Sequence, residues 1–259
     1  MQYFGATNQG IRRSSNQDAF SINIAGNLLI ATVCDGMGGA LGGDVASSIA
    51  VETYAKKLIK YINSTLSFVY LGDIPAFGEP CNYFPDLHLG DFIAKSIDVA
   101  NAAVYDAACH DANLQGMGTT LTSCIVTPTG VVTANIGDSR IYFVQDGEIR
   151  KLTRDHSLVQ SLIDQGKITE KEALRHPNRN IILRALGVDE KVEADVSFFP
   201  YTKGTLLLCS DGLSNYYDEE FFLQTLESKR TPEEKVTLLI DYANQCGGAD
   251  NITAVLIKL

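Results

Sequence analysis

The stretch IATVCDGMGGALGGDVASS, residues 30–48, runs from an apolar segment into a carboxylate and then into a cluster of glycines. Asp35 ends the apolar segment, and Gly36 begins the glycine-rich part that precedes an alanine-rich region. A tight turn is one explanation, because Asp-Gly is a common turn dipeptide. The other explanation is a backbone that must come very close to a charged group, which the absence of side chains permits.

Aspartates stand next to predicted strands at three further places in the chain. Asp138 and Asp211 each follow an apolar run, in VTANIGDSR and GTLLLCSDGLS, and Asp250 in CGGADNITAVLIKL precedes the final run. In an antiparallel arrangement, the ends of some strands and the starts of others share one edge of the sheet. The four carboxylates, Asp35 included, can therefore converge although they lie far apart in the sequence.

Converging carboxylates repel one another, and a bound cation would compensate their charge. Carboxylate oxygens in this number suit Mg²⁺ or Mn²⁺. Gly36 would then let a main-chain carbonyl approach the ion, and Gly38 and Gly39 would keep bulky side chains out of the site. Zinc is disfavoured, because the four histidines lack ligand spacing and the cysteines form no cluster.

An arginine and a further aspartate flank a short polar segment near the N-terminus, in GIRRSSNQD. Arg13 carries a planar guanidinium that can hold two phosphate oxygens, as phosphoryl chemistry beside a cation site requires. Asp18 lies directly before a predicted strand. Each feature alone has a simpler explanation, because an Arg-Arg pair is typical of a solvated surface and Asp-Gly of a turn. The combination of strand-end aspartates with this arginine favours a functional site.

The remaining sequence consists of short apolar runs and amphipathic stretches. A tight hairpin is predicted in RIYFVQDGEIRKL, where Asp146-Gly147 joins two alternating strands. Helices are predicted from Asp44 to Leu58, from Asp91 to Ala108, and from Thr231 onward. Strands are predicted at Leu28–Cys34, Thr120–Val126, Val131–Ile136, Ile141–Val144, Thr205–Cys209 and Ile252–Ile257.

Neighbouring strand runs with helices in pairs between them differ from the regular alternation of a doubly wound parallel sheet. The pattern predicts an α+β fold in which mostly antiparallel sheets are covered by helices. It also predicts a single domain over residues 1–259, because no repeat or linker divides the chain. Residues 61–90 have no clear period and are interpreted as a surface insertion. Residues 154–191 carry short helical patterns and are predicted to form a flap outside the sheets.

The chain of 259 residues has a formal net charge of −10, and 45% of its residues are hydrophobic. Its largest basic clusters are pairs, so it lacks the basic stripe of a surface that binds nucleic acid or anionic lipid. It has no run of about 18 apolar residues that could span a membrane, and its first residues show no secretory signal. The six cysteines are expected to be free thiols. We therefore expect a cytoplasmic protein, and no heptad run indicates assembly beyond a monomer.

Six short motifs mark the chain in this order: GIRRSSNQD, VCDGMGG, GMGTT, NIGDSR, CSDGLS and GGADNIT. In these motifs the sequence resembles the bacterial metal-dependent serine/threonine protein phosphatases, the PPM or type 2C family. The resemblance extends from about residue 3 to the C-terminus. It implies a four-layer αββα sandwich, in which two antiparallel β-sheets are flanked by pairs of helices and a binuclear metal centre lies at one edge.

The resemblance also implies roles for the candidate metal ligands. Asp35 would bridge two central Mn²⁺ or Mg²⁺ ions, and Gly36 would offer its carbonyl to one of them. Asp211 and Asp250 would complete the shell of the other ion. Asp138 together with Asp211 matches the weaker third metal site of bacterial members.

Other positions match or depart from the family pattern. Arg13 matches the arginine that grips the phosphate, and Asp18 matches the acidic residue that holds metal-bound water. The segment after LTRDHS matches the flap beside the substrate groove. Gln17 replaces a frequent carboxylate, Ala40 stands where a histidine is frequent, and Met37 replaces the general-acid histidine of some eukaryotic relatives.

The resemblance implies hydrolysis of phosphoserine and phosphothreonine in proteins, by attack of a metal-bridging water on phosphorus and without a phosphoenzyme. The partners would then be phosphorylated proteins that are substrates of a serine/threonine kinase. A binding protein without catalysis is an alternative, but it would lack acidic ligands, and none is missing here. A phosphoesterase of small molecules or nucleic acid is another alternative. The acidic balance disfavours nucleic acid, and rates of phosphate release from phosphopeptides and nucleotides would separate the two activities.

Overall fold

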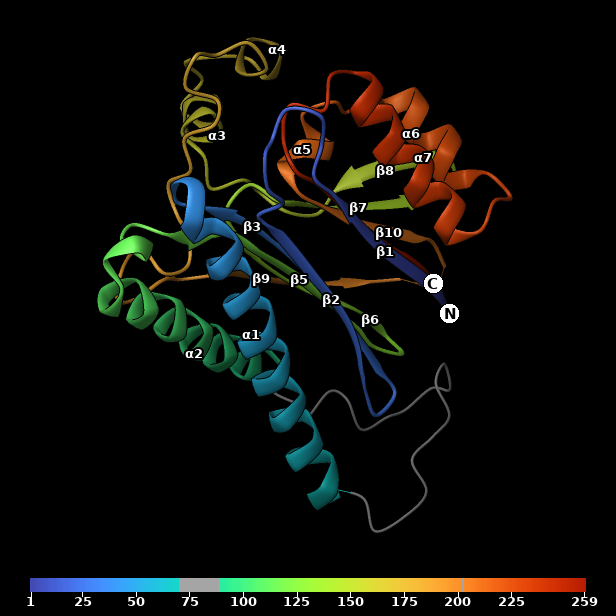
Figure 1. The fold of residues 1–259 in the computed structure, drawn as a ribbon. Coiled ribbons are helices and arrows are strands. Elements are labelled where there is room, and N and C mark those ends of the chain that lie inside the picture. The colour runs from blue at the N-terminus through green and yellow to red at the C-terminus, as the bar shows by residue number, and fades with distance from the viewer. Residues whose placement is uncertain (70–88, 202) are drawn as a thin grey trace.

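Two antiparallel β-sheets form the centre of the computed structural model, which describes residues 1–69, 89–201 and 203–259 (Figure 1). The first sheet has the order β1 (Gln2–Asn8), β11 (Ile252–Lys258), β10 (Thr205–Cys209), β7 (Arg140–Gln145) and β8 (Glu148–Lys151). The second has the order β2 (Asp18–Ala25), β3 (Leu28–Met37), β5 (Leu121–Val126), β6 (Gly130–Ile136) and β9 (Asp195–Pro200), and β4 (Gly118–Thr119) pairs with β3. Neighbouring strands pair antiparallel throughout the described residues, which confirms the predicted sheet type.

Two pairs of helices cover the outer faces of the sheets. They are α1 (Gly39–Val69) with α2 (Leu89–His110) on the second sheet, and α6 (Glu219–Glu227) with α7 (Pro232–Gln245) on the first. Shorter helices are η2 (Ala112–Leu114), α3 (Leu158–Asp164), α4 (Glu170–Ala173) and α5 (Asp211–Ser214). Each helix pair shares an apolar core with its sheet, and a third core lies between the sheets. The predicted four-layer αββα sandwich is therefore confirmed.

The central strands are apolar throughout because both of their faces are buried. On β3, Leu29 and Val33 pack into the core between the sheets, whereas Ile30 and Cys34 pack against α1 and α2. Successive residues of a strand point to opposite faces, so a strand covered on both sides needs no polar alternation. Among the described helices, none combines the length and hydrophobicity that a membrane crossing requires.

The glycine-rich stretch forms the start of a helix. We expected the helix to begin near Asp44, but α1 begins at Gly39, so this prediction was wrong. The reason is steric: a Cβ on Gly36 would lie 2.0 Å from the carbonyl oxygen of Gly43. Gly38 adopts a φ of +130°, which side chains rarely allow. The absence of side chains therefore lets the first turns of α1 lie directly on the end of β3.

Residues 61–90 and residues 154–191, the two segments expected to lie outside the sheets, differ in structure. α1 extends to Val69 and α2 begins at Leu89, so both ends of the 61–90 stretch are helical, contrary to expectation. Residues 70–88 of this predicted insertion lie outside the described residues. Residues 154–191 contain α3 and α4 and belong to neither sheet, and Figure 1 shows these two helices projecting beyond the sheets.

The contact between Gly36 and Gly43 makes a prediction about stability. Gly36→Ala should lower the free energy of unfolding by ~3 kcal/mol, because the added methyl group meets backbone that cannot rotate away. Gly90→Ala is the matched control, since a Cβ there meets nothing within 4 Å and alanine favours the helix by roughly 0.5 kcal/mol. Urea unfolding measures both variants, and equal midpoints for Gly36→Ala and the wild type would contradict the packing argument.

Candidate active site

The pairing of β2 with β3 brings two candidate carboxylates side by side. Asp18, the first residue of β2, is the direct cross-strand partner of Asp35. Residues opposite one another in an antiparallel pair have Cβ atoms about 5 Å apart, so like charges there repel. Asp35 does not end its strand, contrary to the expectation from the sequence, because β3 continues to Met37 and pairs there with β4.

Three further aspartates reach the same edge of the sandwich. Asp211 begins α5 directly after β10, and Asp250 lies shortly before β11. Asp138 occupies the turn between β6 and β7. Burial and the charge of Asp250 raise the pKa of Asp211, whereas the neighbouring Asp35 carboxyl lowers it. Burial raises the pKa of Asp35 well above its ordinary value, and the charges of Asp18 and the other three aspartates raise it further. The structure thus brings five carboxylates together.

Two of these carboxylates keep one oxygen without a partner. Oδ2 of Asp18 accepts hydrogen bonds from the hydroxyls of Ser210, at 2.8 Å, and Thr253, at 2.6 Å. Oδ1 of Asp18 and Oδ1 of Asp138 are buried and have no hydrogen-bond partner among the described residues. The pKa of Asp18 is raised to about 7 and that of Asp138 to about 8. Burial is the largest cause in both cases, and the charge of Asp211 also contributes.

The candidate arginine lies at the rim of this carboxylate cluster. Nη2 of Arg13 is 2.6 Å from Oδ2 of Asp250, and 49% of the Arg13 side chain is exposed. The hydrogen bond with Asp250 raises the pKa of Arg13, as do the charges of Asp35 and Asp211. Within the described residues, no group of three or more His, Cys, Asp or Glu side chains has the geometry of a formed metal site. Asp211 instead accepts a hydrogen bond from Asn215, and Asp250 accepts one from Arg13.

A buried amide positions the loop that carries Arg13. The Asn251 Nδ2 donates to the carbonyls of Gln9, at 2.9 Å, and Ser15, at 2.8 Å. Its Oδ1 accepts from the backbone N–H of Gln17 at 2.9 Å. Neither Asn251 nor the two hydroxyls that hold Asp18 were predicted from the sequence, although they lie within the CSDGLS and GGADNIT motifs.

This chain departs from the family pattern at Gln17, Met37 and Ala40, and the structure describes the contacts of the first two. The backbone N–H of Gly36 donates to the carbonyl of Gln17 at 3.1 Å. The Gln17 side chain packs against Gly43, whose missing Cβ would lie 2.7 Å from its Cδ. Met37 ends β3 in the pairing with β4. The side chain of Ala40 lies outside the described part of the structure.

Comparison with known proteins identifies relatives along almost the whole chain. The family model described as protein phosphatase 2C matches residues 8–244. The chain is 40% identical over 254 residues to the serine/threonine phosphatase stp of Listeria monocytogenes, covering 97% of this chain and 93% of that protein. It is 34% identical to the serine/threonine protein phosphatase PstP of Mycobacterium tuberculosis, covering 99% of this chain and 44% of that longer protein.

Solved structures agree with this relationship. The serine/threonine phosphatase Stp1 from Staphylococcus aureus superposes with a TM-score of 0.85 at 30% identity, covering 99% of this chain and 94% of that one. The catalytic domain of PstP, solved in complex with two manganese ions, superposes with a TM-score of 0.77 at 31% identity, covering 98% of this chain and 96% of that one. The chain therefore belongs to the protein phosphatase 2C, or PPM, family of serine/threonine phosphatases.

Proposed function

We propose that this protein is a metal-dependent phosphatase that hydrolyses phosphoserine and phosphothreonine in other proteins, without a phosphoenzyme. The observation that carries the proposal is the gathering of five carboxylates, from four separate parts of the chain, at one edge of the sandwich. The names of the relatives support the substrate class, since stp and PstP are serine/threonine phosphatases. Opposing a serine/threonine kinase as a cytoplasmic monomer is part of the same proposal.

The carboxylates fit a pair of divalent cations. Buried like charges destabilise one another unless positive charge compensates them. The unpartnered Oδ1 of Asp18 supports this fit, because a buried oxygen without a hydrogen bond has its lone pairs free for an ion or its water. We assign Asp35, Asp211 and Asp250 as ligands of two Mn²⁺ or Mg²⁺ ions, together with the carbonyl of Gly36. The two manganese ions in the PstP catalytic domain support the number.

When bound, such ions supply a water of lowered pKa and positive charge against the phosphoryl oxygens. The protein's own groups complete the arrangement. Asp18 orients water through its free Oδ1, because its other oxygen is fixed by two hydroxyls. Arg13 exchanges Asp250 for the phosphoryl group of the substrate, since its half-exposed guanidinium can hold two oxygens in a fixed geometry.

The thiols nearest the carboxylates are unsuited to act as nucleophiles. Cys34 and Cys209 are fully buried in the apolar cores. Burial raises the pKa of Cys209 to about 12 and that of Cys34 further, so neither forms a thiolate at neutral pH. Ser210 is also buried, and its hydroxyl donates to Asp18. These facts support direct attack by water without a covalent intermediate.

A third, weaker ion is proposed at Asp138 with Asp211. The charge of Asp211 raises the pKa of Asp138, which places the two groups within electrostatic reach of each other. Oδ1 of Asp138 lacks a partner within the described residues. Arg140 and Asp155, which form an ion pair at 2.7 Å, both lie within electrostatic reach of Asp138.

Removal of a central ligand should abolish catalysis. Asp35→Asn and Asp211→Asn should each lower kcat for p-nitrophenyl phosphate with Mn²⁺ by ~100-fold or more, because a neutral amide is a poor ligand for a hard cation. Asp241→Asn, at an exposed position of α7, is the matched control and should keep wild-type turnover. Wild-type turnover in either Asp35→Asn or Asp211→Asn would exclude that residue as a ligand.

The metal-free protein should lose stability as the pH rises. Carboxyls whose pKa is raised by folding hold protons more tightly in the folded than in the unfolded chain, so their contribution is greatest below about pH 4. For Asp138 it is lost by about pH 8, the pKa of that carboxyl in the folded chain. Urea unfolding in the presence of a chelator should show a decrease on the order of 2 kcal/mol between pH 5 and pH 8. Excess Mn²⁺ should reduce this dependence, and an equal dependence with and without Mn²⁺ would contradict metal binding by the cluster.

The third site makes a separate prediction. Asp138→Ala should lower turnover by ~10-fold while the two central ions stay bound, because neither central ion depends on this carboxylate. Mn²⁺ titration by calorimetry counts the bound ions, and phosphate release from a phosphopeptide measures turnover. Loss of the central pair in Asp138→Ala would show that the site is not separate.

A further inference from the structure

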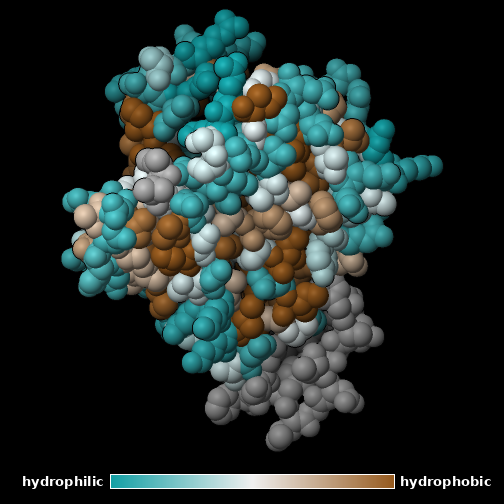
Figure 2. Space-filling view, viewed as in Figure 1, coloured by the Kyte–Doolittle hydropathy of each residue, from teal (hydrophilic) through white to brown (hydrophobic). Residues whose placement is uncertain are grey.

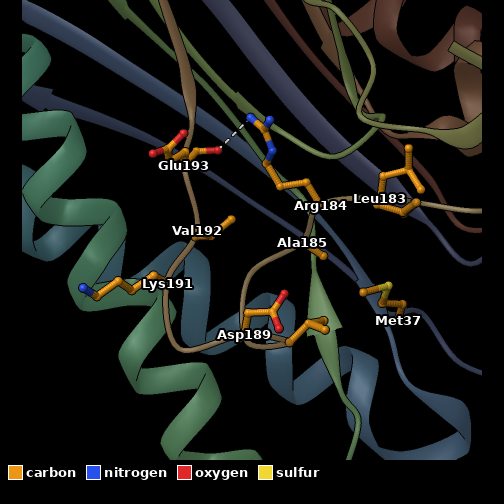
Figure 3. A pocket seen from close by; sticks show the side chains of 10 residues that line it. Met37, Leu183, Arg184, Ala185, Asp189, Lys191, Val192 and Glu193 are labelled. Carbon is orange, nitrogen blue, oxygen red and sulfur yellow. Dashed lines mark hydrogen bonds between the residues drawn. The ribbon is translucent and has the colours of Figure 1, made fainter. Parts of the chain in front are cut away.

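A pocket of about 280 Å³ lies beside the end of β3 and is walled by residues 182–193, which lead from α4 back to β9 (Figure 3). Much of its lining is apolar, contributed by Met37, Leu183, Ala185, Val188 and Val192. In Figure 3 the Lys191 side chain extends away from Ala185, whereas Val192 points toward Ala185. The pocket lining therefore combines these apolar side chains with charged ones from Arg184, Asp189, Lys191 and Glu193.

The pocket is joined by backbone pairing to the strand that carries Asp35. Met37 lies two residues beyond Asp35, so both side chains point to the same face of β3. Met37 pairs with Gly118 of β4. Thr119 of β4 in turn exchanges two backbone hydrogen bonds with Leu186, at 3.1 and 2.8 Å. One continuous backbone network thus fixes the pocket wall relative to the carboxylate cluster.

A buried amide of α2 holds the far wall. Asn101 is 1% exposed, and its Nδ2 donates to the carbonyls of Asp189, at 2.9 Å, and Glu190, at 3.1 Å. Its Oδ1 accepts from the backbone N–H of Gly187 at 2.8 Å. Asn101 thus makes three hydrogen bonds to the backbone of the turn at residues 187–190, and these bonds hold the turn in place. A pocket formed in advance loses little entropy when it is filled.

The apolar groups at the mouth of the pocket remain open to solvent. Leu183 is 58% exposed and Val188 is 48% exposed. In Figure 2 the tip of the α3–α4 segment is hydrophilic, and apolar side chains gather at its base. The guanidinium of Arg184 is already engaged, by the carbonyl of Glu193 at 2.9 Å and by Asp195 at 3.0 Å. The exposed side chains of Leu183 and Val188 are therefore apolar surface that this pocket offers to a ligand, beside its charged groups.

We propose that the pocket receives an apolar side chain of the substrate protein, two or three residues away from the phosphoserine or phosphothreonine. This inference rests on the proposed function. An extended peptide advances about 3.3 Å per residue, and Asp35 and Met37 are separated by about 7 Å along β3. A side chain two residues from the phosphorylated residue can therefore reach the pocket while the phosphate lies at the carboxylate cluster. The substrates selected would be phosphopeptides with leucine, isoleucine or valine near the modified residue.

The test compares phosphothreonine peptides that differ only in the position of one leucine among serines. For the wild type with Mn²⁺, kcat/KM should rise ~10-fold when leucine occupies one or two neighbouring positions on one side, because burial of an apolar side chain contributes selectivity of this size. Val188→Asp should reduce the leucine-to-serine ratio to near one, since a carboxylate then stands at the mouth. The ratio cancels any general loss of activity.

Leu174→Asp is the matched control, because Leu174 is 63% exposed on the same segment and does not line the pocket. This variant should keep the wild-type ratio. A wild-type profile that is flat at every position would overturn the proposal, and so would a preference that survives in Val188→Asp. Failure of the proposed function would look different, because the wild type would then release no phosphate from any peptide with Mn²⁺.

Discussion

The repulsion among five carboxylates at one edge of the sandwich is the constraint around which the site is built. Asp18 and Asp35 face each other across β2 and β3, and three more aspartates raise the electrostatic cost of ionising Asp35. Hydrogen bonds from the hydroxyls of Ser210 and Thr253 stabilise the ionised form of Asp18. Arg13 neutralises Asp250 from the solvent side. The unpaired oxygens that remain are those for which a cation is the natural partner.

Much of the fold could be predicted because its causes are local. Apolar runs buried on both faces mark the central strands, and the Asp146-Gly147 turn follows from backbone preference, with φ values of 52° and 81°. Aspartates at strand ends could be recognised because antiparallel strands share their edges. The start of α1 could not be predicted in this way. Glycine normally disfavours helix, and only tertiary contacts explain the missing side chains: a Cβ on Gly36 would meet the carbonyl of Gly43, and a Cβ on Gly43 would meet the Gln17 side chain.

The supporting groups of the site depend on contacts between distant parts of the chain, which a single sequence does not show. Asn251 resembles any polar residue before a strand, yet it ties together three points of the loop that carries Arg13. Asn101 is equally inconspicuous within α2, where it holds the turn beside the apolar pocket. Both act through backbone groups, so their partners carry no distinctive side chain that a motif could reveal.

The position of β11 has a consequence for synthesis of the protein. This strand lies between β1 and β10 in the first sheet, and Asp250 and Asn251 directly precede it. A ribosome makes β1 before β11, so β1 stays without this neighbour while all the intervening strands are made. The loop bearing Arg13 stays unanchored for the same time. The hydrogen bonds from Asn251 that hold this loop can therefore form only after the residues next to β11 have left the exit tunnel.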